Sequence, residues 1–173
     1  MGSLLKSNTS HNKIKVFGII LQVVLLLFNV LSCAWADNSG VWIKIVKHEH
    51  LLYVMNGKSV VAKYGVAVGR NSGQKQKSGD CRTPEGNFSV QSIQSAQGWS
   101  HDFHDGKGVI PDAYGPWFIR LKTGWSGIGI HGTHDSASIG KNVTEGCIRL
   151  KNENLRTLKE KYIKVGMVVI VER

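Results

Sequence analysis

The chain has 173 residues, 42% of them hydrophobic and 20% charged, so it is long enough to bury the core of one ordinary domain and too short for two. Its 22 lysines and arginines outnumber its 12 aspartates and glutamates, which gives a formal net charge of +10. The basic residues are scattered singly, and no basic run has interleaved aromatics, so the sequence argues against a nucleic-acid partner despite this charge.

The first 36 residues are predicted to be a targeting segment. Three lysines precede an apolar run over residues 16–30, and Ala34-Trp35-Ala36 then places small residues at the two positions that a signal peptidase inspects. We therefore expect a signal peptide over residues 1–36, a mature domain over residues 37–173, and export to the periplasm or cell envelope. Two alternatives stay open: an uncleaved membrane anchor through residues 14–30, and lipidation at Cys33.

Cleavage after residue 36 leaves 19 lysines and arginines against 12 acidic residues, a net charge of +7. A basic exported domain suits polyanionic surroundings, such as a cell-wall polymer that carries carboxylates. The alternative is that the charge only keeps the protein soluble.

The mature chain is predicted to be mainly β, with one helix near its end. Short apolar or alternating runs, bounded by turn residues, predict its strands. They cover residues 41–46, 51–55, 60–68, 87–93, 117–121, 127–131 and 167–171.

Turn and cap residues add detail to this pattern. Asn56-Gly57 predicts a hairpin turn, and Gly65 is expected to be a bulge in the strand that follows. Asn152 is expected to cap the helix, which ends before Gly166. The polar residues 69–79 predict a mobile loop, and residues 94–116 form a long aperiodic stretch of the kind that covers a functional site.

The most informative motif brings a histidine close to a cysteine. Ile130-His131-Gly132-Thr133 is followed, thirteen residues after Gly132, by Glu145-Gly146-Cys147-Ile148-Arg149-Leu150. A thiol is a useful nucleophile near neutral pH when a base takes its proton, and histidine is the commonest such base. The motif therefore predicts Cys147 as nucleophile and His131 as general base. The alternative is a small buried cysteine beside a structural histidine.

The neighbours of this pair have predicted roles as well. The backbone N–H groups of Gly146 and Cys147 are candidates for an oxyanion hole. Arg149 lies two residues from the nucleophile and so on the same face of a strand, where it could bind a substrate carboxylate or hold the loop through carbonyl groups. Gly132, Thr133 and Trp117 are further candidates for substrate binding, and Thr133 and Thr144 are candidates to join the arms of the loop.

Two other chemistries have to be considered. The spacing of His131 and His134, repeated in His101 and His104, allows a zinc site together with Asp135. That spacing places two histidines on one face only in a helix, and Gly132 disfavours a helix, so we predict no metal. Cys81 is the second cysteine of the mature chain and could form a regulatory or inhibitory bridge with Cys147.

These motifs together resemble the L,D-transpeptidase catalytic domain family of the YkuD type. The resemblance rests on Gly129 to Thr133, Ser138-Ile139-Gly140 and Glu145 to Leu150, with support from Arg82 to Gly86 and from Tyr114-Gly115-Pro116-Trp117. It covers residues 41 to 172. Many members carry a histidine where this chain has Glu145, which puts in doubt any role of that position in proton transfer.

The resemblance implies a β-sandwich-like fold of mixed sheets with one short C-terminal helix and no metal or organic cofactor. It implies attack on a peptidoglycan stem tetrapeptide after its third residue, release of D-alanine, and transfer of the acyl group to an amine. The acceptor would be diaminopimelate, a D-amino acid or a wall-attached protein. Hydrolysis of the same peptide and non-catalytic wall binding are the alternatives.

Overall fold

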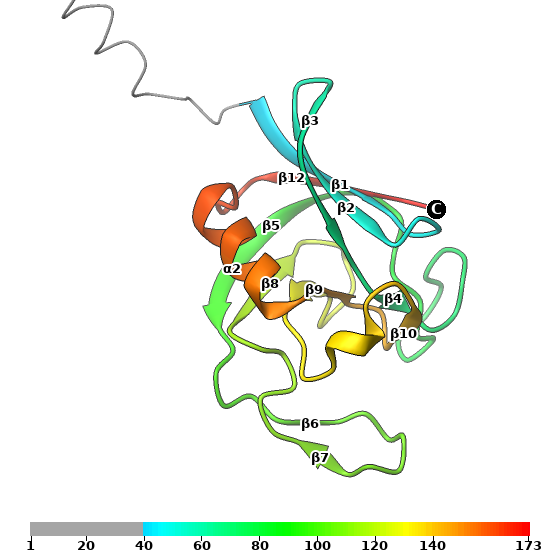
Figure 1. Cartoon of the computed structure of the whole chain (residues 1–173). Helices are drawn as coiled ribbons and strands as arrows, with labels where there is room; N and C mark the ends of the chain where they lie inside the picture. Colours follow the sequence, from blue (N-terminus) through cyan, green and yellow to red (C-terminus); the bar gives the residue numbers. More distant parts are fainter. Residues whose placement is uncertain (1–39) are drawn as a thin grey trace, which may run out of the picture. The chain divides into compact units, whose positions relative to one another are not determined.

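The computed structural model describes residues 40–173, so the expected signal peptide, the anchor segment 14–30 and Cys33 lie outside the described residues (Figure 1). The strands of the main sheet are β1 (Val41–Val46), β2 (Leu51–Asn56), β3 (Ser59–Gly65), β5 (Gly86–Ser95), β8 (Trp117–Leu121), β9 (Gly129–His131), β11 (Ile148–Arg149) and β12 (Val168–Glu172). The remaining elements are β4 (Val68–Gly69), β6 (His101–Asp102), β7 (Val109–Ile110), the 3-10 helix η2 (Ser136–Ser138), β10 (Asn142–Thr144) and the helix α2 (Asn152–Lys161).

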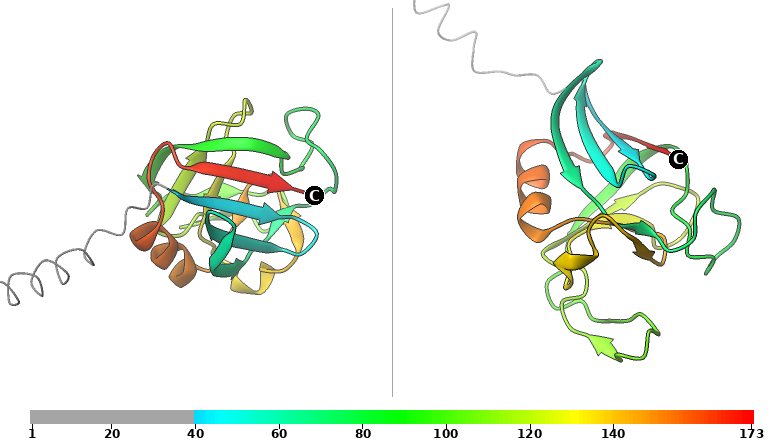
Figure 2. Two further views of the ribbon diagram at one scale, coloured as in Figure 1. Left: turned by 90° about the horizontal axis from the view of Figure 1, so that it is seen from above. Right: turned by 45° about the vertical axis from the view of Figure 1, so that its right-hand side comes forward.

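The main sheet has eight strands in the order β11-β9-β8-β5-β12-β1-β2-β3, and it is mixed. Its last strand, β12, lies in the middle, parallel to β1 and antiparallel to β5. The sheet curls strongly, as Figure 2 shows from two directions. The predictions of a mainly β fold, mixed pairing and one short C-terminal helix are confirmed.

The curl is filled by an apolar core to which α2 contributes. In β1 the residues Val41, Ile43 and Ile45 alternate with less buried neighbours, as expected for a strand with one face on the core. Leu155 and Leu158 of α2 are fully buried against the same cluster. Each fully buried Leu or Ile contributes about 1.5 to 3 kcal/mol relative to exposure. The core therefore fixes β8, β9 and β11, which carry the predicted site.

Several local predictions need correction. A bulge was predicted at Gly65, but Gly65 pairs regularly with Leu51. The register of the β2–β3 pairing instead shifts between Val54 and Met55. Asn152, predicted as the cap, is the first residue of the helix, Lys151 occupies the N-cap without a side-chain hydrogen bond, and the amide of Asn152 binds the backbone of Thr133. The long stretch 94–116 contains the β6–β7 hairpin, which projects from the body below the sheet in Figure 1.

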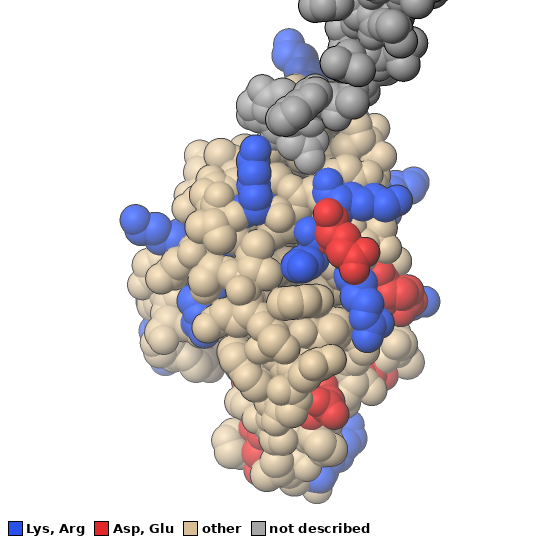
Figure 3. All heavy atoms as spheres, turned by 90° about the vertical axis from the view of Figure 1, so that its left-hand side faces the viewer, with Lys and Arg blue, Asp and Glu red and all other residues tan. Residues whose placement is uncertain are grey.

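Lys and Arg side chains are spread over the face shown in Figure 3 and are mixed with acidic ones. Within residues 40–173 the structure contains no helix long and apolar enough to cross a membrane.

Candidate active site

One pocket, with a volume of about 600 Å³, collects the chemically reactive residues of the described chain. Cys147 and His131 both line it, together with Arg149 and Glu145. The ladder between β9 and β11 explains why, since Arg149 is the register partner of His131 and Cys147 directly precedes β11. We call this pocket the Cys–His pocket. The sequence predicted that these two side chains lie close together, and they share this pocket.

His131 is held firmly at the end of β9. Only 2% of its surface is exposed, and its ring stacks on Phe118 with the centroids 5.6 Å apart and the planes 5° apart. The ring of Tyr114 meets it edge-on at 4.9 Å. Packing on two sides fixes the orientation of the imidazole before any substrate arrives.

The hydrogen bond of His131 defines its tautomer. Nδ1 lies 2.7 Å from the carbonyl oxygen of Gly132, and because a carbonyl can only accept, Nδ1 carries the proton. This leaves Nε2 with a free lone pair. Burial, helped by the nearby Arg149 charge, lowers the pKa of His131 to about 3, so the imidazole is neutral.

Cys147 depends on the glycine that precedes it. Gly146 has φ +132, a left-handed conformation, and a Cβ at this position would lie 2.9 Å from the carbonyl oxygen of Arg82. Only glycine fits here without strain. The thiol of Cys147 then donates to the carbonyl oxygen of Gly127 at 3.1 Å.

The thiol is protonated in the free protein. Burial, together with a smaller effect of the Glu145 carboxylate, raises the pKa of Cys147 to about 11. The backbone N–H of Gly129 and the charge of Arg149 act in the opposite direction but are weaker than burial. The resting pocket therefore holds a neutral thiol and a neutral imidazole, so the reactive thiolate has to form during attack.

Thr144 closes the turn that leads to the nucleophile. Its hydroxyl donates to the carbonyl of Cys147 at 2.6 Å and accepts from the N–H of Gly146 at 3.1 Å. The N–H of Gly146, predicted for the oxyanion hole, is thus engaged within the turn. Its hydroxyl therefore bonds within its own turn, and the expected link between the two arms of the loop is not made by this side chain.

Arg149 is buried between the sheet and the hairpin, with 4% of its surface exposed. Its Nη1 donates to Ser138 Oγ at 3.2 Å, and its guanidinium lies 5.3 Å from the ring centre of Phe103. Its Nε is buried without a hydrogen-bond partner among the described residues. Arg149 thus holds the 3-10 helix through Ser138 and still has an unused donor.

Gly132, Thr133 and Trp117 do not line the Cys–His pocket. The backbone N–H and carbonyl of Thr133 bind the amide of Asn152 at 2.8 and 3.0 Å, and a Cβ on Gly132 would collide with that amide. These contacts fix the chain that leaves His131. Trp117 lies on β8, where Lys159 of α2 covers its ring at 4.3 Å.

Cys81 also lines the pocket, and both cysteines are free. The preceding residues 69–79, predicted to be a mobile loop, are held by a buried ion pair of 2.7 Å between Lys75 and Asp80. Burial alone would raise the pKa of Asp80, but hydrogen bonds from Gln76, Lys75, Arg82 and Lys77 outweigh it and keep that pKa well below its usual range. Asp80 thus anchors the segment that presents Cys81.

Sequence reasoning did not identify the residues that form the outer wall. His101 and Phe103 lie in and just after β6, and Nε2 of His101 lies 2.9 Å from Oε2 of Glu145. Phe103 packs on both His101 and Arg149. The length of the aperiodic stretch predicted a cover, and His101 was singled out only as a possible zinc ligand. Tyr114 was part of a quoted motif without an assigned role.

The residues considered for a zinc site are not grouped as metal ligands in the described part of the chain. Within residues 40–173 no group of three or more His, Cys, Asp or Glu side chains is arranged to hold a metal ion. His101, predicted as one possible ligand, contacts Glu145 and the rings of Phe103 and Tyr114.

The curled mixed sheet and the pocket that contains a cysteine and a histidine can now be compared with known proteins. The chain matches the L,D-transpeptidase catalytic domain (YkuD) over residues 40–171. It is 30% identical over 133 residues to the "Putative L,D-transpeptidase YqjB" of Bacillus subtilis (strain 168), which covers 75% of this chain and 70% of that protein. The chain belongs to the L,D-transpeptidase catalytic domain family.

Solved structures agree with this fold. An L,D-transpeptidase from Mycobacterium smegmatis has a TM-score of 0.55 at 22% identity, covering 78% of this chain and 59% of that one. L,D-transpeptidase 3 from Mycobacterium tuberculosis, solved with a faropenem-derived adduct, has a TM-score of 0.59 at 18% identity, covering 78% and 60%. The chain thus spans about three fifths of these structures.

Proposed function

We propose that this protein is a peptidoglycan L,D-transpeptidase in which Cys147 is the nucleophile. It would cleave the stem tetrapeptide after its third residue and transfer the acyl group to an amine. The observation that carries the proposal is the shared pocket, where a neutral imidazole with a free Nε2 lies in the same cavity as the thiol. Membership of the family supports the reaction type.

In the first half-reaction the sulfur of Cys147 attacks the donor carbonyl and its proton passes to Nε2 of His131. The tetrahedral intermediate then collapses, the C–N bond breaks, and the proton goes to the amine of the departing D-alanine. In the second half-reaction an acceptor amine attacks the thioester, the C–S bond breaks, and the amine proton returns through His131 to the sulfur. His131 is neutral at the start and end of each half-reaction.

The oxyanion requires donors in the turn before β11. Because the N–H of Gly146 is used by Thr144, we assign the N–H of Cys147 to the oxyanion. Removing one such donor costs about 2.7 to 4 kcal/mol of barrier. The role of Gly146 is to allow the backbone conformation of this turn, with φ +132.

The setting of the reaction follows from the proposed substrate. We propose that residues 1–36 direct export and that the domain from residue 37 acts on stem peptides in the periplasm or cell envelope. The basic composition suits a wall polymer that carries carboxylates. No cofactor enters the reaction.

The nucleophile is tested by acylation with a carbapenem, followed by intact mass. The full chain should gain the mass of one carbapenem. Cys81→Ser is a matched control, because Cys81 is the other thiol of the same pocket, and it should be labelled as well. Cys147→Ala should not be labelled. Labelling of Cys147→Ala, or its loss in Cys81→Ser alone, would contradict the assignment.

The reaction is tested by incubating the full chain with a disaccharide tetrapeptide. Dimers, or exchange of the terminal D-alanine for an added D-amino acid, support a transpeptidase. Tripeptide as the sole product would instead identify a hydrolase that uses the same thioester. An intact tetrapeptide would point to a non-catalytic wall-binding domain.

A further inference from the structure

The described part of the chain contains two cysteines, and both line the Cys–His pocket. Cys147 is the proposed nucleophile, whereas Cys81 has no part in the reaction derived above. Both are free thiols in the structure. The sulfur of Cys81 makes a long contact of 3.6 Å to the carbonyl oxygen of Gly79. Two thiols in one pocket offer a chemistry that a single nucleophile lacks, because they can form a disulfide.

The backbone segments that carry the two thiols are packed against each other. Arg82 directly follows Cys81 in the chain. A Cβ added to Gly146, the residue before Cys147, would lie 2.9 Å from the carbonyl oxygen of Arg82. A disulfide requires Cα atoms about 4.4 to 6.8 Å apart, so it forms between segments whose backbones are close neighbours. The segments of Cys81 and Cys147 have this arrangement.

Gly69 of β4 connects the same two segments through a second set of contacts. A Cβ added to Gly69 would lie 2.6 Å from the carbonyl oxygen of Cys81. In the pairing of β4 with β10, Gly69 is the partner of Thr144, whose hydroxyl donates to the carbonyl of Cys147 at 2.6 Å. Both cysteines therefore belong to one compact group of turns beside the pocket.

The backbone of Cys81 is held in a conformation that its side chain does not favour. Its φ is +54, in the left-handed region that residues other than glycine rarely adopt. The carboxylate of Asp80, which is 3% exposed, accepts hydrogen bonds from the N–H groups of Gln76 and Arg82 at 2.7 and 3.1 Å. Strain of this kind persists where the surroundings enforce it and is frequent at functional sites.

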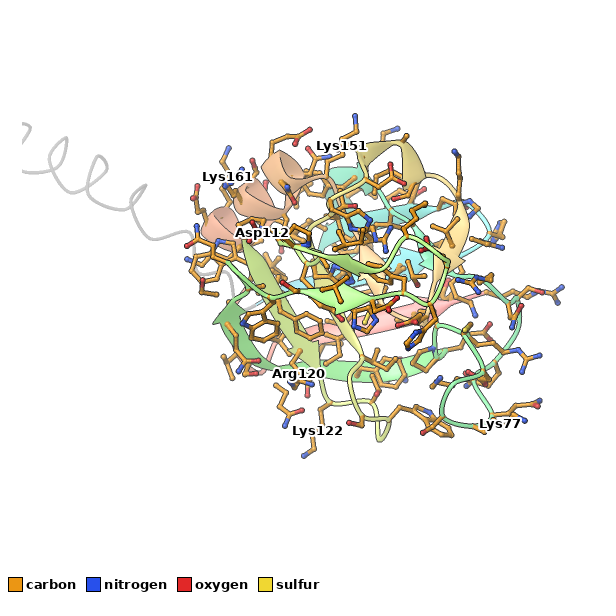
Figure 4. The ribbon with its side chains drawn as sticks, turned by 90° about the horizontal axis from the view of Figure 1, so that it is seen from below. Lys77, Asp112, Arg120, Lys122, Lys151 and Lys161 are labelled. Atoms are coloured by element: carbon orange, nitrogen blue, oxygen red, sulfur yellow. The ribbon has the colours of Figure 1, made fainter. Side chains whose placement is uncertain are left out.

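Small molecules in solution can reach the loop that leads to Cys81. Lys77, Ser78 and Gly79 are exposed, and Lys77 lies at the outer edge of the molecule in Figure 4. Cys81 itself is half-buried and is one of the residues that line the open pocket. It is therefore placed to meet an oxidant that enters from this side.

We propose that Cys81 and Cys147 form a reversible disulfide when the protein meets a small-molecule disulfide, and that this bridge inactivates the nucleophile. The consequence for activity rests on the proposed function, and the bridge adds control of the same site by oxidation. Disulfides form and persist in the oxidising surroundings of exported proteins. Activity there then depends on a thiol reductant that opens the bridge.

With oxidised glutathione as the oxidant, the bridge forms in two exchange steps. The sulfur of Cys81 attacks the glutathione S–S bond, which breaks and releases one glutathione thiolate. The sulfur of Cys147 then attacks the sulfur of Cys81 and releases the second glutathione thiolate. The two thiol protons pass to the two released thiolates. The protein loses two electrons, and these reduce the oxidised glutathione.

The order of the two steps follows from the environment of Cys147. Burial raises the pKa of Cys147 to about 11, so little thiolate is available for direct exchange with a disulfide in solution. Attack on a mixed disulfide at Cys81 is intramolecular, and proximity compensates for the small thiolate fraction. Cys81 is thus required for fast oxidation of the pocket.

The bridge is tested directly by treating the full chain with oxidised glutathione, blocking the remaining thiols with N-ethylmaleimide and digesting with trypsin without reduction. Trypsin releases residues 78–82 and 142–149 as separate peptides, each with one of the two pocket cysteines. These two peptides should be recovered joined by a disulfide, and dithiothreitol should separate them. Cys33 lies in a different peptide, so a bridge to it is told apart.

The effect on the site is measured by carbapenem acylation after the oxidant has been removed. The oxidised full chain should not be acylated, and dithiothreitol should restore acylation. Cys81→Ser is the matched control, because it keeps Cys147 and removes its partner. Compared with its own untreated sample, Cys81→Ser should lose acylation about tenfold more slowly, or slower still, than the unmodified chain does.

Two results would overturn the bridge: no joined peptide after oxidation, or equal rates of inactivation in the unmodified chain and in Cys81→Ser. The proposed function fails in a different way. If the reduced, unmodified chain is not acylated and releases no D-alanine, the function is wrong, whether or not the peptides are joined. If the reduced chain is acylated but the joined peptide does not form, only the bridge is wrong.

Discussion

The two walls of the Cys–His pocket are built in opposite ways. The inner wall comes from β9 and β11, whose backbones are paired within the eight-stranded sheet and whose side chains His131 and Arg149 are 2% and 4% exposed. The outer wall comes from the β6–β7 hairpin, whose two short strands pair only with each other. The comparison indicates that the sheet fixes the reacting atoms and the hairpin shapes what reaches them.

The largest effect should come from the inner wall. His131→Gln removes the only nitrogen in the proposed pair that can take the thiol proton, so carbapenem acylation should slow by about 10² to 10⁴-fold. The measurement is the second-order rate of mass gain, with thermal unfolding to confirm the fold. His104→Gln, from the exposed outer wall, should stay within about threefold. A similar loss in both variants would remove the distinction between the walls.

Asn152→Ala tests what supports the inner wall from behind. It deletes two hydrogen bonds to the backbone of Thr133, each worth about 0.5 to 1.5 kcal/mol net, so the free energy of unfolding should fall by about 1 to 3 kcal/mol. Urea unfolding measures this, and acylation should slow because the chain after His131 loosens. Asn154→Ala, two residues along the same helix, is the control and should be nearly neutral. Equal stability in the two variants would show that the contact to Thr133 contributes little.

Substitutions in the outer wall should have a small effect on tetrapeptide turnover. The Glu145–His101 pair is 41% and 31% exposed, and such surface pairs contribute about 0 to 1 kcal/mol. Glu145→Gln should therefore change the donor KM by less than about fivefold, and added salt should shrink the difference. The assay is tetrapeptide turnover at low and high salt. A large fall in kcat would instead give Glu145 a part in proton transfer.

The same contrast explains what the sequence could and could not predict. Ile43, Ile45, Val169 and Val171 alternate or cluster because they face one core, so strand positions follow from local pattern. Cys147 and His131 were identifiable because His131 ends one short strand and Cys147 directly precedes another, in a compact motif. The partner of Asn152 is 19 residues away, so its local capping preference gave the wrong assignment. Tertiary contacts decide such cases.

The hairpin illustrates the opposite limit. Residues 94–116 have no hydrophobic period, so nothing local indicates that Phe103 packs on Arg149 or that His101 reaches Glu145. The engagement of the Gly146 N–H by Thr144 was equally invisible, because a hydroxyl can bond several backbone groups in a turn. Positions that depend on loop geometry require coordinates, whereas residue types that serve chemistry can be recognised from sequence.

The smallest expected effect is the absence of a pH dependence. With the pKa of His131 lowered to about 3 and that of Cys147 raised to about 11, both groups keep their neutral forms between these values. The rate of carbapenem acylation should therefore be nearly flat from about pH 5 to about pH 9. A preformed thiolate–imidazolium pair would instead give a rate that rises tenfold per pH unit below an apparent pKa in this range. The same profile in Glu145→Gln separates any step due to the outer-wall pair from one due to the buried pair, and a step that persists in that variant would show that burial does not hold the pair neutral.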